Sequence, residues 1–347
     1  MNLIEKQQLQ EEVSNLRQML DKRYGFESII GRSGPMERLF EMMKMVAPTR
    51  SSVLIIGESG TGKELVANAL HRASPRRNER FLAINCGAIP SDILESELFG
   101  HERGAFTGAV ARKIGKFELS HRGTLFLDEI SELYPELQVK LLRVLEERQV
   151  MRVGGSELID VDFRLIAATN RDLEKEVVEG RFREDLYYRL KVVTLRIPPL
   201  RERPGDIQQL ADHFLEIYCQ EHGKSPKRLS PETLELLSRF PWPGNVRELR
   251  NVIESVVVFH QGEVIQPADL PIEVRESSAL AAPGSPVQAV AGEPRTMADI
   301  ERQAILETLS RTGGHRARAA DILGIGLRTL QRKLKEYKDE GHLQDDL

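Results

Sequence analysis

Apolar residues along this chain form two kinds of pattern. Short apolar runs predict buried strands at residues 52–56, which are rich in β-branched residues, and at residues 123–127 and 163–168. Residues 65–70 and 91–99 instead have helical patterns. In the second of these, Leu94 and Leu98 lie one turn apart, and Gly100 ends the pattern. Strands that alternate with helices predict an α/β fold in which a parallel sheet lies between helices.

The C-terminal segment has a helical pattern throughout. Residues 296–311 are predicted to form a helix, with Thr296 and Asp299 as its cap pattern. Residues 316–323 and 327–337 then flank a Gly-Ile-Gly turn, which predicts a helix-turn-helix. The apolar face of the last helix consists of Leu327, Leu330, Leu334 and Tyr337. Polar residues lie away from that face: Arg328, Thr329, Gln331, Arg332 and Lys335.

Charge separates this segment from the rest of the chain. Residues 311–338 carry eight Lys or Arg and two acids, a net of +6, whereas the whole chain has −4, which leaves −10 elsewhere. A basic island in an acidic protein is typical of nucleic-acid binding. We therefore expect double-stranded DNA as a partner, contacted by the five polar residues just named. A small helical hairpin with a solvated basic face is the alternative.

The remaining composition is ordinary for a multi-domain globular protein of 347 residues. No apolar run approaches the ~18 residues of a transmembrane helix, and the polar opening residues are unlike a signal peptide. We therefore expect a cytoplasmic protein without membrane contact. Apolar residues at positions 9–20 form a heptad-like seam of barely two heptads, short of the ~3–4 that a coiled coil needs. A linker helix is expected over residues 1–25, with pairing between subunits left open.

A glycine-rich loop follows the first predicted strand and precedes a helical pattern. It consists of Gly57, Glu58, Ser59, Gly60, Thr61, Gly62 and Lys63. In such a strand–loop–helix unit the backbone N–H groups surround phosphates, and the helix N-terminus favours their negative charge. Lys63 would reach the β- and γ-phosphates, whereas Glu64 stands where the general pattern has a magnesium-binding Ser or Thr. The loop predicts a nucleoside triphosphate site.

Two adjacent carboxylates, Asp128 and Glu129, end the second predicted strand. At the carboxyl end of a parallel strand, Asp128 can hold magnesium and Glu129 can orient a water for attack on the γ-phosphate. Asn170 follows the third strand and could contact the γ-phosphate or that water, although Asn at a strand end is usually turn chemistry. A solvated acidic turn is the alternative for the carboxylates. The loop and the carboxylates together are what ATP hydrolysis needs from one sheet.

Three arginines are further candidates. Arg183 and Arg189 lie six residues apart on a predicted helix and are either ordinary ion-pair residues or arginine fingers for a neighbouring subunit's nucleotide. Arg247 lies at a predicted helix start, where Asn245 is expected as the N-cap with Glu248 three residues later. A plain surface arginine is the alternative for Arg247.

A second small-residue loop lies between the phosphate loop and the carboxylates. It consists of Gly104, Ala105, Phe106, Thr107, Gly108 and Ala109. The two glycines free the backbone around Phe106, and flexible loops with a lone aromatic residue can contact partners. The alternative is a disordered surface turn whose Phe106 folds back into the core.

Six motifs, GESGTGKE, GAFTGA, TLFLDE, ATN, FREDLYYRL and WPGNVREL, are spread over roughly residues 29–270. Together they resemble the central domain of the sigma-54-dependent transcriptional activators, which are AAA+ ATPases, and GAFTGA is close to diagnostic. The C-terminal segment resembles the Fis-type DNA-binding domain that usually closes these activators. The resemblance implies an AAA+ α/β core with a helical lid and a small all-α helix-turn-helix domain.

The resemblance also implies roles for individual residues, and it makes Glu64 usual at its position. Asp128 and Glu129 are implied as the Walker B pair, and Asn85 as the switch asparagine that restrains Glu129. Asn170 and Arg247 are implied as the two sensors, and Arg183 and Arg189 as trans-acting arginines. Within residues 104–109, Phe106 and Thr107 are implied as contacts to the sigma factor. The expected organisation is a linker helix (1–25), α/β core (26–197), lid (198–272), flexible linker (273–295) and helix-turn-helix domain (296–347).

The implied function is an activator that binds upstream DNA sites and uses ATP and Mg²⁺ to remodel the sigma-54 RNA polymerase closed complex. Self-association as a dimer and a ring hexamer is also implied. Most relatives carry a sensory domain, often the receiver of a two-component system. Only about twenty-five residues precede the ATPase here, too few for a domain. We therefore expect control by a separate partner, or a longer regulator of which this chain is a fragment.

Two other function classes were weighed. An AAA+ remodelling or replication-loading ATPase with a DNA-binding tail has no use for Phe106 and Thr107 in such a loop. A DNA-binding repressor with a vestigial ATPase conflicts with the intact Lys63, Asp128 and Glu129.

Overall fold

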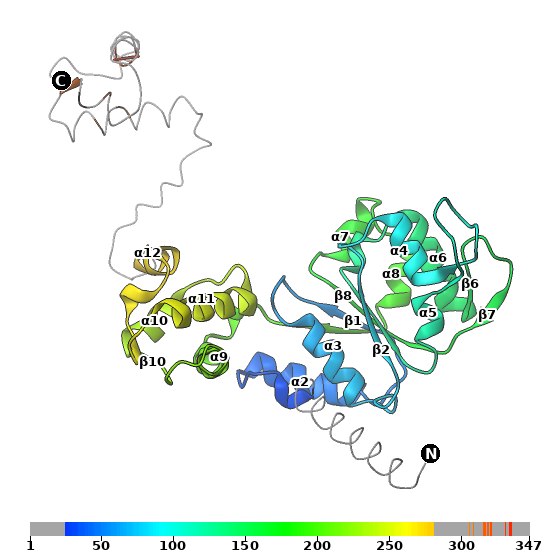
Figure 1. Ribbon diagram of the computed structural model, residues 1–347, viewed down its shortest axis with the longest axis horizontal. Coiled ribbons are helices and arrows are strands. Elements are labelled where there is room, and N and C mark those ends of the chain that lie inside the picture. The colour runs from blue at the N-terminus through cyan, green and yellow to red at the C-terminus, as the bar shows by residue number, and fades with distance from the viewer. Residues whose placement is uncertain are drawn as a thin grey trace, which may run out of the picture. The chain divides into compact units, whose positions relative to one another are not determined.

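A computed structural model describes residues 25–280, together with residues 305, 308, 315, 316, 318, 320, 330, 333 and 334. The chain divides into two compact units, Met1–Pro283 and Gly284–Leu347. The predicted linker helix before residue 25 and most of the predicted linker before residue 296 lie outside the described residues. In the first unit, Figure 1 shows a sheet flanked by helices, joined in the chain to a separate group of helices.

Five parallel strands form the sheet, in the order β2-β5-β8-β1-β9. Their bounds are β1 Val53–Ile56, β2 Phe81–Asn85, β5 Thr124–Asp128, β8 Arg164–Thr169 and β9 Val193–Arg196. The three predicted strands are β1, β5 and β8, the adjacent central strands of the sheet. Sequence patterns did not single out the two edge strands, because both are only partly buried and β9 carries polar residues.

Side chains along the central strands alternate between two cores, as the pleat of a strand requires. Val53 and Ile55 of β1 pack with helices α2 (Gly34–Val46) and α3 (Lys63–Arg72), whereas Leu54 packs in the core on the other face. That second core is covered by α4 Ser91–Phe99, α5 Lys116–Leu119, α6 Pro135–Glu147, α7 Leu173–Val178 and α8 Glu184–Leu190. Helix α4 matches the helix predicted over residues 91–99.

Short elements complete the first unit. Three two-stranded sheets pair β3 (Gly100–His101) with β4 (Lys113–Ile114), β6 (Gln149–Met151) with β7 (Leu158–Asp160), and β10 (Arg228–Leu229) with β11 (Val264–Ile265). The 3-10 turns are η1 Phe26–Ser28, η2 Ile130–Glu132, η3 Leu200–Glu202, η4 Pro204–Asp206 and η5 Pro267–Asp269.

The helical lid consists of α9 Ile207–Glu221, α10 Pro231–Arg239, α11 Asn245–Phe259 and α12 Ile272–Leu280. Its core surrounds Trp242, which is fully buried and donates its indole N–H to the Leu237 carbonyl at 2.8 Å. The lid was expected to end at residue 272, but α12 continues to Leu280 and Val274 is buried in the lid core. The first residues of the predicted linker are therefore helical, because their apolar face packs on the lid.

In the second unit, the described residues within the predicted helices are helical. Ile305, Ala320 and Leu330 are buried, and Leu330 belongs to the predicted apolar face. The predicted DNA contacts all lie outside the described residues: Arg328, Thr329, Gln331, Arg332 and Lys335.

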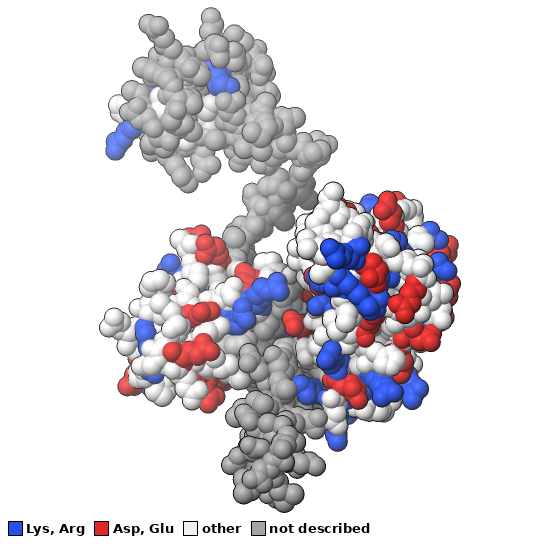
Figure 2. Space-filling model, turned by 45° about the vertical axis from the view of Figure 1, so that its right-hand side comes forward, with Lys and Arg blue, Asp and Glu red and all other residues white. Residues whose placement is uncertain are grey.

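The surface of residues 25–280 differs in charge pattern from the basic C-terminal segment. Figure 2 shows acidic and basic side chains interspersed over the face that it presents of these residues. Among the residues that the structure describes, no helix combines the length and apolar character that crossing a bilayer requires.

A buried histidine ties helix α3 to the sheet. His71 is 1% exposed, its Nδ1 lies 2.9 Å from the Thr124 hydroxyl at the start of β5, and its ring packs on Phe81 of β2. Burial lowers the pKa of His71 to about 4, and the nearby charge of Arg72 acts in the same direction. Because α3 begins at Lys63, this contact helps to fix the helix at whose N-terminus the phosphate loop lies.

His71 should make the core sensitive to acid. Its pKa of about 4 in the folded protein is below the ordinary value of 6.5, so the unfolded chain binds the proton first. The free energy of unfolding should therefore decrease as pH falls from about 6.5 to about 4, with His71 responsible for up to ~3 kcal/mol of the loss. Denaturant titrations across this range should show a smaller loss for His71→Gln than for the parent, whereas the exposed His222→Gln should follow the parent. Equal slopes for all three proteins would contradict the prediction.

Candidate nucleotide-hydrolysis site

The phosphate loop, residues 57–63, connects β1 to α3 as predicted. Gly60 and Gly62 have φ angles of 78° and 100°, in the left-handed region that favours glycine. Lys63 is the first residue of α3, and its ammonium group donates to the carbonyls of Gly57 (3.0 Å) and Glu58 (3.1 Å). The lysine is thereby held inside the curve of the loop, at the positive end of a helix.

Lys63 and the two strand-end carboxylates share one electrostatic environment. Burial lowers the pKa of Lys63, whereas Asp128 and Glu129 act to raise it. Burial raises the pKa of Asp128, and Lys63 opposes that shift. The structure thus brings together the loop and the carboxylates that the sequence marked separately.

Glu129 adopts a left-handed backbone conformation, with a φ of 53°. Its carboxylate lies against Gly87, where a Cβ atom would come within 2.5 Å of Glu129 Oε2. Asn85 pairs in register with Asp128, and its Oδ1 accepts the N–H groups of Gly87 (2.8 Å) and Ala88 (2.9 Å). Asn85 therefore holds the turn that supports Glu129. Sequence reasoning missed Gly87, for which the only signal was a glycine two residues after a strand end.

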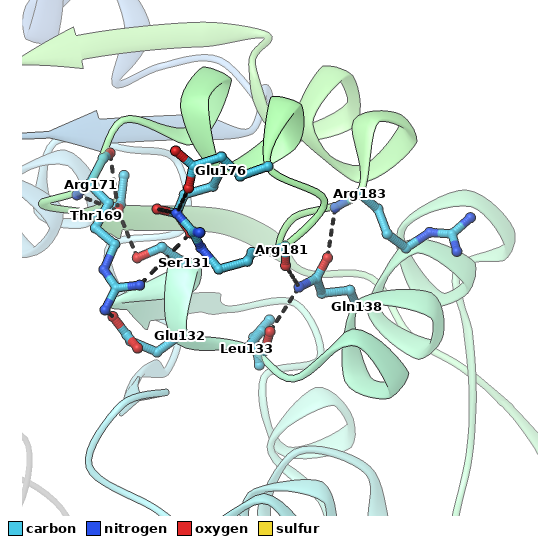
Figure 3. Close-up of polar contacts among 10 residues, drawn as sticks. Ser131, Glu132, Leu133, Gln138, Thr169, Arg171, Glu176, Arg181 and Arg183 are labelled. Atoms are coloured by element: carbon cyan, nitrogen blue, oxygen red, sulfur yellow. Dashed lines mark hydrogen bonds and ion pairs between the residues drawn. The ribbon is translucent and has the colours of Figure 1, made fainter.

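Asn170 lies at the carboxyl end of β8, between two anchored residues. Thr169 donates its hydroxyl to Ser131 at 3.0 Å, and Arg171 forms an ion pair with Glu132 at 2.6 Å, so that the segment after β8 is tied to the turn after β5 (Figure 3). Asn170 itself is exposed and lines a cavity of about 650 Å³ beside the start of the phosphate loop.

Arg247 reaches the phosphate loop from the lid. Its Nη1 donates to the Ser59 hydroxyl at 3.1 Å, and its backbone N–H donates to the Gly60 carbonyl at 3.3 Å. Arg247 therefore contacts the phosphate loop and is not a plain surface arginine.

The prediction of Asn245 as an N-cap is wrong. The cap position is Gly244, and Asn245 is the first helical residue, with a left-handed φ of 52°. Its amide bonds to the phosphate loop instead of to the N–H groups of its own helix. Glu248 accepts the N–H of Gly244, the actual cap residue, at 2.8 Å, whereas the N–H of Asn245 donates to the Trp242 carbonyl.

Arg183 and Arg189 are exposed around α8. The backbone N–H of Arg183 donates to the buried Gln138 at 2.8 Å, and its guanidinium, which Figure 3 shows pointing away from the other labelled groups, pairs with Asp185 at 2.6 Å. Arg189 donates to the Leu145 carbonyl at 2.8 Å. The recorded partners of both guanidinium groups thus belong to α6 and α8, not to the phosphate loop.

The second loop, residues 104–109, is closed by its own backbone. Gly104 donates to the Ala109 carbonyl (2.9 Å), and Ala109 donates to the Phe106 carbonyl (3.0 Å). Phe106 is 45% exposed and packs edge-on against His101, so it does not fold into the core, while Thr107 beside it is exposed. Ala109 is buried and therefore belongs to the base of the loop, whereas Phe106 and Thr107 form its exposed tip.

A buried arginine connects this loop to the ATPase core. Arg152 donates to both oxygens of Glu118 (2.8 and 2.6 Å) and to Glu102 (2.8 Å), two residues before the loop begins. His101 bonds in turn to the hydroxyl of Ser96 on α4 at 2.7 Å. The loop tip is exposed on a base that is firmly held.

Three family models match the chain: the Sigma-54 interaction domain over residues 29–196, the AAA+ ATPase lid domain over 201–285, and the Bacterial regulatory protein, Fis family, over 296–337. Over 307 residues the chain is 49% identical to the transcriptional regulatory protein ZraR of Salmonella typhimurium, with 88% of this chain and 68% of ZraR covered. This chain belongs to the sigma-54-dependent transcriptional activators.

Other relatives agree. The activator is 45% identical to the nitrogen fixation protein AnfA of Azotobacter vinelandii over 334 residues, 96% of this chain and 62% of AnfA. The crystal structure of NtrX from Brucella abortus in complex with ATP superposes on this chain with a TM-score of 0.71 and 36% sequence identity. The match covers 96% of this chain and 73% of the NtrX chain. The predicted AAA+ core, lid and Fis-type domain are confirmed, and the activator is an ATP-binding ATPase.

Replacing Glu129 by Gln should separate binding from hydrolysis. The change removes the proposed water-orienting carboxylate and leaves the phosphate loop intact, so kcat should fall by about 10²–10⁴-fold while the Kd for ATP stays near the parent value. Glu136→Gln, the same change at an exposed position on α6, is the control. Steady-state ATPase assays and nucleotide titrations measure the two quantities, and near-parental kcat would remove Glu129 from the mechanism.

Proposed function

We propose that this activator hydrolyses ATP to convert the closed complex of sigma-54 RNA polymerase and promoter into an open complex, while it is bound to upstream DNA. The observation that carries the proposal is the exposed tip at Phe106 and Thr107, which lies on a held base outside the phosphate site. A remodelling ATPase without a sigma-factor partner has no use for such a tip.

In the proposed mechanism each residue of the phosphate site has one role. The backbone of residues 57–63 cradles the phosphates, Lys63 binds the β- and γ-phosphates, and Glu129 orients the attacking water. Asn170 contacts the γ-phosphate or the water, and Arg247 reports the phosphate state to the lid.

Asp128 fits a magnesium ion. It is a half-buried carboxylate beside Lys63, and Mg²⁺ is usually bound through one or two carboxylates together with substrate phosphates. Glu64, the exposed residue that follows Lys63, is proposed as a further residue of the nucleotide-binding site. When bound, the ion neutralises charge that develops on the phosphates.

The connection from hydrolysis to the tip is proposed to run along the chain. Asn85 holds the turn that supports Glu129, and α4 begins at Ser91, six residues after Asn85. Helix α4 ends at Phe99, and the segment that leads to Phe106 begins at Gly100. A shift of the turn at Gly87 would therefore move α4 and the base of the loop.

A ring hexamer, with Arg183 and Arg189 acting on a neighbour's nucleotide, is part of the proposal. Both arginines are exposed, and their guanidinium groups bond within α6 and α8. Trans-acting arginines in other systems contribute about 10³–10⁵ to the rate.

Mixing two inactive variants should test the shared site. Lys63→Ala subunits mixed with Arg189→Ala subunits should regain part of the ATPase rate, because some interfaces then combine an intact phosphate loop with an intact arginine. A mixture of Lys63→Ala with Glu129→Gln should regain none, since both changes damage the same side of the interface. The ATPase rate over a range of mixing ratios decides, and the absence of recovery in the first mixture would contradict a shared site.

The remaining proposals concern DNA and control. We propose that the Fis-type domain, over residues 296–347, reads paired DNA half-sites as a dimer. Its proposed contacts are Arg328, Thr329, Gln331, Arg332 and Lys335.

We also propose that a two-component system controls the activator and that it is located in the cytoplasm, where RNA polymerase and promoters are found. The α/β core is proposed to span residues 26–197, followed by the lid.

Thr107→Ala and Phe106→Ala should uncouple hydrolysis from promoter opening. Both lie outside the phosphate site, so ATPase activity and DNA binding should stay within a few-fold of the parent, whereas open complexes on a sigma-54 promoter should not form. Val178→Ala, at an exposed apolar residue on α7, should open promoters normally. ATPase and open-complex assays on the same preparation are needed. Normal opening by both loop variants would remove the main support for the proposal.

A further inference from the structure

The lid bonds to the outer side of the phosphate loop at consecutive residues. The carboxylate of Glu58 accepts two hydrogen bonds from Arg201 (2.8 and 2.6 Å) and one from the amide of Asn245 (3.1 Å). The carbonyl of Ser59 accepts a second bond from Asn245 (3.0 Å), and the hydroxyl of Ser59 accepts one from Arg247. These contacts join residues 143 to 188 positions apart in the chain.

The next two residues of the phosphate loop, Gly60 and Thr61, also contact the lid. Gly60 lies so close to the lid that a Cβ atom there would come within 2.2 Å of the Gly244 carbonyl. The carbonyl of Thr61 accepts a bond from the buried Arg203 at 3.4 Å. The loop thus has helix α3 on one side and the lid on the other.

Asn245 is the centre of these contacts. Its side chain is fully buried, and its Oδ1 accepts the N–H of Leu200 at 2.8 Å while its Nδ2 donates to Glu58 and Ser59. One amide therefore joins the phosphate loop, the segment that leads into the lid and the first turn of α11.

The backbone around Asn245 is strained. Asn245 and Trp242 have φ angles of 52° and 49°, and a positive φ is uncommon outside glycine, most of all for a bulky residue. Such conformations persist only where the surroundings enforce them, and they cluster at functional sites. Here the enforcing contacts are the buried Trp242 on one side and the phosphate loop on the other.

We propose that Asn245 is a positioning residue for ATP hydrolysis, which locks the lid onto the phosphate loop through the carboxylate of Glu58. The lock sets the position of Arg247, two residues along α11, against the loop. It also gives the lid a direct link to the loop backbone, whose movement on binding or hydrolysis it would follow. This inference rests on the proposed assignment of residues 57–63 as the nucleotide site.

A double-mutant cycle tests the lock. Asn245→Gly keeps the positive φ at little cost and removes the amide, and Glu58→Ala removes its partner. Each should lower kcat by roughly 10-fold to 10²-fold, the range that a misplacement of about 1 Å can cause. The double variant should lose less than the product of the two single deficits, because both changes break the shared bond between Asn245 and Glu58, while each also removes contacts of its own. Deficits that multiply would show independent roles and overturn the proposal, as would a parental kcat for Asn245→Gly.

A second pair of substitutions exchanges the hydrogen-bond donor and acceptor between positions 245 and 58. Asn245→Asp keeps an acceptor for the Leu200 N–H but sets a carboxylate against Glu58, so it should lower kcat. Adding Glu58→Gln should restore part of that loss, because the glutamine amide can donate to the new carboxylate. Recovery of kcat supports the lock even if Asn245→Gly folds poorly, whereas no recovery in a folded double variant overturns it.

Two further proteins separate failure of the lock from failure of the site. Arg239→Ala breaks an exposed ion pair with Glu235 on the lid surface and should leave kcat unchanged, which shows that lid substitutions alone have no effect. Lys63→Ala should abolish ATP binding. If it does not, the assignment of the loop fails. If it does, and the Asn245 variants hydrolyse ATP normally, only the lock fails.

Discussion

The backbone of the phosphate loop is the constraint on which the rest of this structure depends. Its N–H groups can face phosphates only if its curve is held from outside, and the recorded contacts provide that support from β1, α3 and the lid. Gly60 shows how tight the arrangement is, because its left-handed backbone and the closeness of Gly244 both exclude a side chain. The lid therefore belongs to the structure that holds the phosphate loop in shape.

The same logic extends to the loop that carries Phe106. The strand ends place Asn85 beside Asp128, the turn at Gly87 supports Glu129, and α4 leads from that turn to His101. The steps are a strand pairing, a close contact between Gly87 and Glu129, and a continuous helix. An exposed tip on a held base suits the sigma-factor contact that we propose for Phe106.

The central strands β1, β5 and β8 could be predicted because fully buried strands are continuous apolar runs, and the nucleotide motifs end or follow those strands. The edge strands β2 and β9 were not singled out; both are only partly buried, and β9 also carries polar residues. The error at Asn245 has a different cause. An asparagine with a glutamate three residues later is typical of a helix cap, and only the distant Glu58 and Ser59 decide that the amide bonds elsewhere. Contacts between residues this far apart in the chain cannot be predicted from the sequence pattern around either residue.

Two fully buried neutral amides position backbone near the proposed catalytic groups. Gln138 fixes the backbone of Arg183, and Asn245 fixes the loop beside Arg247; both amides are fully buried with all their recorded partners in place. A charged residue in either position would carry a large desolvation cost. In place of Asn245 it would also add a charge beside the phosphate loop. An amide holds the geometry without competing for the nucleotide's charge, which explains why these positions suit Asn and Gln and not an ion pair.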